Sequence, residues 1–126
     1  MQRIMIIDDE ADIRGMLKKM LEREEYEVIV SSNGKEGLEL FSKEPTDLVI
    51  TDIVMPEKEG IETITELKKH YRDVKIIAMS GGGNAGVENY LRMAKAFGAN
   101  RTLAKPFQRI QLLTAVKDLL FEDVLR

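Results

Sequence analysis

Two patterns of hydrophobic positions alternate along the chain. Five short runs are apolar almost throughout or rich in β-branched residues, and they predict β-strands over 3–7, 26–30, 47–51, 74–79 and about 101–104. Between these runs, apolar residues recur at intervals of three and four, which keeps them on one face of an α-helix. This spacing predicts helices over 11–24, from Asn33 to just before Pro45, over a segment carrying Ile61 through Tyr71, around 87–97, and from near Gln108 almost to the end.

The helix boundaries and faces carry further signals. Asn33 has a side-chain oxygen suited to an N-cap, and Pro45 disfavours helical backbone at the residue before it. Two helices have apolar sets that we expect to face inward: Val87, Tyr90, Leu91, Ala94 and Phe97 in the fourth, and Ile110, Leu113, Val116 and Leu120 in the last.

Strict alternation of strands and helices predicts an α/β fold with a five-stranded, doubly wound parallel sheet. The strands are apolar on both faces, which fits a sheet covered by helices on both sides. A length of 126 residues is typical of one domain, and the sequence contains no linker-like stretch or repeat. We therefore expect residues 1–126 to form a single domain.

Composition excludes several classes of protein. Hydrophobic residues make up 44% and charged residues 33% of the chain, as in globular proteins. No apolar run approaches the roughly 20 residues of a membrane span, and the acids from Asp8 to Glu10 do not fit a secretory signal peptide. Cysteine is absent, which excludes disulfides and thiolate metal sites. The net charge of −3 argues against nucleic acid binding by this domain.

Acidic residues stand where the first and third strands end. Asp8 and Asp9 follow one strand, and Asp52 follows the other, so a parallel sheet brings all three carboxylates to one edge. Two such charges ~5 Å apart repel by roughly 3 kcal/mol at an effective dielectric of 20. A hard divalent cation, above all Mg²⁺, would relieve this repulsion. The alternative is that these acids only cap the following helices or form turns.

Two further groups should reach the same edge. Ser80 ends the fourth strand, and Lys105 follows the fifth and precedes Pro106. A lysine ammonium suits a phosphoryl oxygen, although Lys105 could instead act only as a counter-ion to the acids. With no cysteine or histidine in this set, a carboxylate is the candidate nucleophile, forming an acyl phosphate. Asp52 fits that role because it stands alone at its strand end.

These motifs together resemble the receiver domain of two-component response regulators, over essentially the whole chain. The matching segments are "IIDDE" from Ile6, "DIVMP" from Asp52, "AMSG" around Ser80 and "KPF" from Lys105. The resemblance implies a flavodoxin-like (βα)5 receiver fold and a phosphoacceptor role for Asp52. It also implies Mg²⁺ held by Asp9, Asp52 and the backbone carbonyl of Val54, with Asp8 assisting.

The same resemblance implies a cytoplasmic signalling switch rather than a multiple-turnover enzyme. The phosphoryl group would come from a sensor histidine kinase, a phosphotransfer protein or a small phosphodonor. Phosphorylation would change the surface near the Ser80 loop and the last helices, which a downstream protein or an output domain would read. No membrane or nucleic acid partner is implied for this domain, and a homodimer stays open.

A small phosphohydrolase that forms an aspartyl phosphate is the alternative function. Such hydrolases commonly carry a second acid two residues after the nucleophile, where this chain has Val54.

The chain also departs from the receiver pattern, because Thr102 replaces the aromatic residue usual three positions before the lysine. We therefore expect the glycine-rich loop 81–86 to carry more of the conformational signal than an aromatic rotamer.

Overall fold

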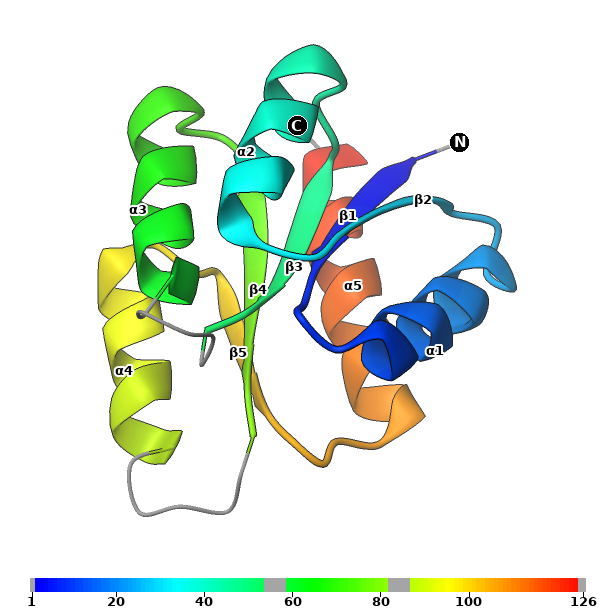
Figure 1. The fold of residues 1–126 in the computed structure, drawn as a ribbon. Helices are drawn as coiled ribbons and strands as arrows, with labels where there is room; N and C mark the ends of the chain where they lie inside the picture. Colours follow the sequence, from blue (N-terminus) through cyan, green and yellow to red (C-terminus); the bar gives the residue numbers. More distant parts are fainter. Residues whose placement is uncertain (1, 54–58, 82–86, 125–126) are drawn as a thin grey trace.

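The fold is known from a computed structural model that describes residues 2–53, 59–81 and 87–124. Strands and helices alternate along these residues, as the hydrophobic pattern predicts (Figure 1). The elements are β1 (Arg3–Ile7), α1 (Ala11–Glu22), β2 (Glu27–Ser31), α2 (Gly34–Lys43), β3 (Leu48–Asp52), α3 (Glu59–His70), β4 (Lys75–Ser80), α4 (Val87–Phe97), β5 (Arg101–Ala104) and α5 (Arg109–Val124).

All five strands form one parallel sheet in the order β2-β1-β3-β4-β5. The predicted doubly wound α/β fold is therefore confirmed. Strand order reverses at β1, since β2 lies on one side of it and β3 on the other. Sheets of this kind bind ligands beyond the carboxyl ends of the strands at such a reversal. The fold alone thus points to the ends of β1 and β3.

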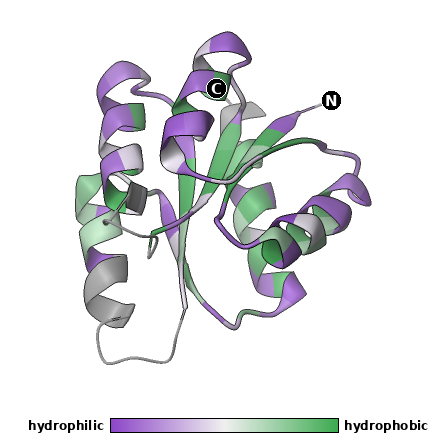
Figure 2. Ribbon diagram, in the orientation of Figure 1, coloured by the Kyte–Doolittle hydropathy of each residue, from purple (hydrophilic) through white to green (hydrophobic). Residues whose placement is uncertain are grey.

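Hydrophobic side chains bury both faces of the sheet, and Figure 2 shows the central strands as predominantly hydrophobic. Alternate residues of each strand enter opposite layers, because successive side chains of a strand point to opposite faces. Ile4 and Ile6 pack with α1 and α5, whereas Met5 and Ile7 pack with the layer of α2, α3 and α4. These two layers are the reason that β1, β3 and β4 are buried along nearly their whole length.

Strand register brings the candidate site residues to one edge. Ile7 pairs with Thr51, so Asp8 and Asp52 each lie one residue beyond the same rung of the ladder. On the other side of β3, Asp52 pairs with Met79, and Ser80 pairs with Ala104. Lys105 follows directly. Residues far apart in the sequence are therefore neighbours here because the strands are parallel and in this register.

Some predicted details differ from the structure. The third strand includes Asp52 and not Asp47, so the acid belongs to the ladder itself. Ile110 is 65% exposed, because the buried face of α5 is centred on Leu112 and Val116 and Ile110 lies on the other side of the helix. Phe97 is 48% exposed, because the chain turns at Gly98 and Ala99 enters the core in its place.

The N-cap prediction for α2 is confirmed. The backbone N–H of Glu36 donates a 2.8 Å hydrogen bond to the side-chain oxygen of Asn33.

Within the described ranges, no helix is both long enough and apolar enough to cross a membrane.

Candidate functional site

Asp8 is a fully buried carboxylate at the end of β1. Its backbone N–H continues the sheet by donating to the carbonyl of Ser31 at 3.2 Å. One carboxylate oxygen accepts the backbone N–H of Glu10 at 2.8 Å, and the other accepts the ammonium of Lys105 at 3.1 Å. A buried charge needs such partners to offset its loss of water. Asp8 is thus held rigidly, with the Lys105 ammonium as its counter-charge.

Asp52 is the corresponding carboxylate at the end of β3, and it is 4% exposed. Its Oδ2 accepts the Lys105 ammonium at 3.2 Å. The start of α3 lies close to the Asp52 backbone: a Cβ at Gly60 would stand 2.4 Å from the Asp52 carbonyl oxygen. Only glycine fits this position without a shift of the backbone. The beginning of α3 therefore packs directly against the backbone at the end of β3.

Lys105 joins the two carboxylates, with its Nζ near both Asp8 and Asp52. Burial alone would lower the pKa of Lys105, but the negative charges of Asp52 and Asp8 outweigh burial and raise it. The ammonium therefore stays protonated at neutral pH. Its backbone N–H donates to the Ser80 carbonyl at 2.7 Å, which ties the lysine to the end of β4.

Gly81 makes room for the Lys105 side chain. A Cβ at Gly81 would stand 2.9 Å from both Cβ and Cδ of Lys105. Any larger residue here would have to displace the lysine stem, which leads directly to the ammonium between the carboxylates. The position of the charge thus depends on a glycine in the neighbouring loop.

Ser80 is buried, and its hydroxyl has no hydrogen-bond partner among the described residues. Buried polar atoms nearly always have a partner, so an exception calls for a physical explanation. Ser80 lies at the same strand edge as Asp52 and Lys105. A hydroxyl in this position is available for an oxygen-rich ligand bound at the edge.

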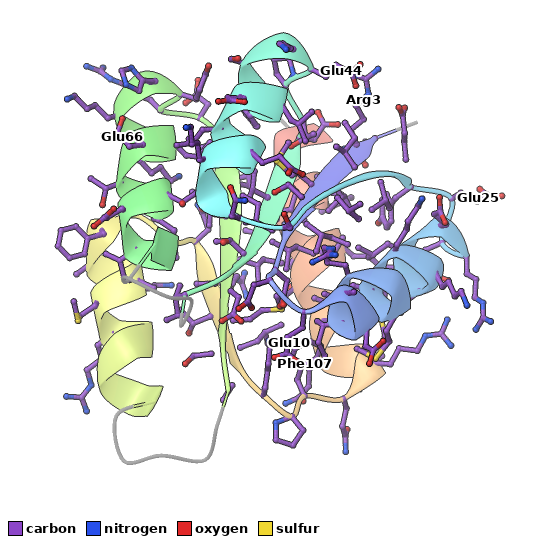
Figure 3. All side chains as sticks on the ribbon, in the orientation of Figure 1. Arg3, Glu10, Glu25, Glu44, Glu66 and Phe107 are labelled. Atoms are coloured by element: carbon purple, nitrogen blue, oxygen red, sulfur yellow. The ribbon has the colours of Figure 1, made fainter. Side chains whose placement is uncertain are left out.

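Asp9 and Glu10 extend the acidic group toward solvent. Ligand oxygens of Asp8, Asp9 and Glu10 lie within 4.8 Å of one another. Figure 3 labels Glu10 in the loop after β1 and Phe107 between β5 and α5, both at the carboxyl end of the sheet. All three donors are carboxylate oxygens, which are ligands that Mg²⁺ prefers. The residues present therefore fit a hard divalent cation.

The sequence-predicted residues are mostly brought together. Asp8 and Asp52 each contact Lys105, Asp9 is beside Asp8, and Ser80 lies at the same edge. The Val54 carbonyl and most of the loop 81–86 lie outside the described residues. Sequence reasoning missed Glu10, whose position next to the acidic pair was the available signal. It also missed the close approach of Gly81 to Lys105, which only packing reveals.

Comparison with known proteins gives a family match. A family model described as the response regulator receiver domain matches residues 4–117. The chemotaxis protein CheY of Halobacterium salinarum is 33% identical over 94% of this chain and 97% of its own length. Sporulation initiation phosphotransferase F of Bacillus subtilis is 31% identical over 92% of this chain and 91% of its own length.

Another relative is longer. The transcriptional regulatory protein SrrA of Staphylococcus aureus is 35% identical over 93% of this chain, which spans only 47% of SrrA. Similar sequences thus occur both in relatives of about the same length and within a longer regulator.

Solved structures of receiver domains share the fold. A response regulator receiver domain protein from Clostridium thermocellum superimposes with a TM-score of 0.89 and 31% identity, covering 99% of this chain and 98% of that one. The response regulator TrrA from Thermotoga maritima, solved in complex with Mg(2+)-BeF, gives a TM-score of 0.83 and 36% identity over 94% of this chain and 99% of that one. The flavodoxin-like fold is therefore confirmed. The chain belongs to the response regulator receiver family: it is a receiver domain of two-component signalling, not a member of a metabolic enzyme family.

Proposed function

We propose that this receiver domain is a phosphorylation-dependent switch in which Asp52 accepts the phosphoryl group. The observation that carries the proposal is the single ammonium of Lys105, shared between Asp8 at 3.1 Å and Asp52 at 3.2 Å. It places a fixed positive charge beside a nearly buried carboxylate at a sheet edge. A phosphoryl group on Asp52 would bring its oxygens to that charge.

The reaction forms one bond and breaks another. A carboxylate oxygen of Asp52 attacks phosphorus, giving an aspartyl phosphate, and the electron pair of the donor's bond to phosphorus leaves with the donor. With a phosphohistidine donor, the leaving atom is the imidazole nitrogen. Hydrolysis later adds water to the acyl phosphate, releases inorganic phosphate and restores Asp52. In both steps the protein mainly positions the reacting groups.

Mg²⁺ is the proposed cofactor. Asp9 and Asp52 would hold it, with Asp8 assisting and the Val54 carbonyl completing the set that the family resemblance implies. When bound, the ion neutralises charge on the phosphoryl oxygens during transfer. The TrrA complex with Mg(2+)-BeF supports this assignment, as does the oxygen-only donor set of Asp8, Asp9 and Glu10.

Lys105 and Ser80 would bind the phosphoryl group once it is attached. When the acyl phosphate forms, the Asp52 carboxylate loses its negative charge, and the Lys105 ammonium would contact a phosphoryl oxygen in its place. The unpartnered Ser80 hydroxyl would donate to another phosphoryl oxygen. Because the Ser80 carbonyl accepts the Lys105 N–H, movement of Ser80 would pass to the segment between β5 and α5. A changed surface near the Ser80 loop and the last helices would be the output.

The donor would be a sensor histidine kinase, a phosphotransfer protein or a small phosphodonor in the cytoplasm. The reader of the signal would be a downstream protein or an output domain. We assign residues 1–126 to this single receiver domain, and a homodimer is one form in which the changed surface could act.

A labelling experiment tests the phosphoacceptor. The chain is incubated with acetyl phosphate and Mg²⁺, and intact-mass spectrometry measures the added phosphoryl group. We expect one group per chain, no label in Asp52→Asn, and full label in the control Asp73→Asn, which removes an exposed acid before β4 at the opposite edge. Persistent label in Asp52→Asn would refute the assignment. Multiple turnover of simple phosphate esters would instead favour the hydrolase alternative.

A further inference from the structure

Arg14 reaches back from α1 to the loop that carries the acidic residues. Its guanidinium Nη1 donates a 2.8 Å hydrogen bond to the backbone carbonyl of Asp8. Arg14 is half-buried and lies in the first turn of the helix, where its own N–H bonds the Glu10 carbonyl at 3.1 Å. The side chain therefore bridges the start of α1 and the end of β1.

The Asp8 carbonyl belongs to the peptide that joins Asp8 to Asp9. The next peptide is anchored as well, because the Glu10 N–H bonds the Asp8 carboxylate at 2.8 Å. Asp9 thus stands between two fixed backbone groups. One of these anchors is supplied by Asp8 itself, and the other is supplied by Arg14.

Asp9 has no such anchor of its own. Its side chain is exposed and, among the described residues, makes no hydrogen bond or ion pair. Among the described residues, only the loop backbone therefore determines where the Asp9 side chain starts and which directions its carboxylate can reach. We propose that Arg14 is a positioning residue, which holds the Asp8–Asp9 peptide so that the Asp9 carboxylate is oriented for a divalent cation. This inference rests on the Mg²⁺ assignment of the proposed function.

The chemistry of arginine suits this task. A charged donor makes a stronger hydrogen bond to a carbonyl than a neutral one, and the planar guanidinium has few orientations in which to make it. Groups that orient a metal ligand without touching the metal commonly affect affinity by about 10- to 100-fold. Loss of Arg14 would remove one of the two anchors around Asp9, so cation binding would have to order the Asp8–Asp9 peptide further.

Helix stability alone gives a poorer account of Arg14. A positive charge in the first turn opposes the helix dipole, whose positive end lies there. Asp12 in the same turn has the favourable sign. The benefit of Arg14 at this position therefore comes from its contact with the loop.

A titration with MgCl₂ tests the inference on the unphosphorylated chain. The amide shifts of Asp9 and Glu10 in ¹⁵N-labelled protein give the dissociation constant for Mg²⁺. We expect Arg14→Gln to weaken binding about tenfold. Arg23→Gln is the matched control, because it removes the same charge from the other end of α1, where the Arg23 side chain makes no hydrogen bond or ion pair within the described ranges. This variant should bind Mg²⁺ as the wild type does. Far-UV circular dichroism checks that each variant is folded.

A kinetic measurement separates positioning from damage to the site. The rate of labelling by acetyl phosphate is measured against Mg²⁺ concentration. In Arg14→Gln, the half-saturating Mg²⁺ concentration should rise about tenfold, while the rate at saturating Mg²⁺ stays near that of the wild type. A merely structural role would lower the amount of active protein without moving the half-saturation point.

The outcomes are distinct. A wild-type dissociation constant in folded Arg14→Gln overturns the inference. Equal weakening in Arg14→Gln and Arg23→Gln also overturns it, because the effect would then not depend on the contact between Arg14 and the Asp8 carbonyl. If Arg14→Gln does not fold, Arg14→Lys replaces it: a lysine lacks the planar fork, so we expect roughly threefold weaker binding, and wild-type affinity would refute the role. Failure of the wild type to bind Mg²⁺, or undiminished binding in Asp9→Asn, would instead overturn the metal assignment of the proposed function.

Discussion

Replacing Lys105 with methionine isolates the charge that joins Asp8 and Asp52. Methionine keeps an unbranched side chain in the space beside Gly81 but removes the ammonium. Each contact of ~3 Å corresponds to roughly 5 kcal/mol of Coulomb energy at an effective dielectric of 20. Since the wild-type lysine also loses hydration on burial, much of this gross energy is offset. Its side chain is 17% exposed, so solvent screening reduces the contribution further.

The expected net cost of Lys105→Met is about 3 kcal/mol at pH 7, which is typical when one partner of a buried ion pair is removed. The carboxylates of Asp8 and Asp52 would remain buried without their shared counter-charge. Urea unfolding in the presence of EDTA measures the loss. The control Lys69→Met removes an exposed lysine of α3 and should change the unfolding free energy by less than about 0.5 kcal/mol.

Mg²⁺ should partly rescue the Lys105→Met variant. Ligand binding to the folded state adds stability that grows with affinity, and the uncompensated acids of the variant should attract the cation more strongly. The increase in unfolding free energy on adding Mg²⁺ is therefore expected to be larger in the variant than in the wild type. If Lys105→Met is as stable as the wild type in EDTA, the two contacts do not stabilise the fold and the reasoning is wrong.

Three other predictions concern separate parts of the molecule. The stability of the protein at alkaline pH depends on Lys105. Because the pKa of Lys105 is raised in the folded state, its contribution to the free energy of unfolding is complete below the unfolded value of about 10.5. That contribution is lost as pH rises through the folded pKa. Urea unfolding from pH 9 to above pH 10.5 should therefore show a steeper loss in wild type than in Lys105→Met, and parallel curves would contradict this. Asn33→Ala removes the N-cap of α2 and should cost about 1 kcal/mol, measured by thermal unfolding; an unchanged midpoint would show that the Glu36 N–H is satisfied otherwise. Leu112→Ala should cost about 2–5 kcal/mol because Leu112 is fully buried, whereas Ile110→Ser should change stability by less than about 0.5 kcal/mol; a large loss in the latter would place Ile110 in the core.

The sequence by itself determined the elements and the edge at which the site forms. Runs such as 3–7 identify strands because their residues are apolar on both faces, and helices show the spacing of one buried face. Once five strands alternate with five helices, a parallel sheet follows, and the ends of its strands must meet. That is why Asp8, Asp52, Ser80 and Lys105 could be grouped before any distance was known.

Only the tertiary structure decided how these groups interact. It shows that one lysine bonds both Asp8 and Asp52, and that the Ser80 hydroxyl has no partner within the described part of the chain. Each of these facts depends on strand register and on how far a side chain extends from its strand. Residue type and spacing carry no information on either quantity.

The rotation of the last helix was only partly predicted by the sequence. Leu113, Val116 and Leu120 are buried as expected, but Ile110 is exposed and Leu112 is buried instead. Arg14 likewise looks like an ordinary surface charge until α1 is placed over the loop after β1. Local periodicity reports backbone conformation, because that conformation is a local property. The rotation of a helix against its sheet is set by all the side chains that pack between them, and those come together only in the folded chain.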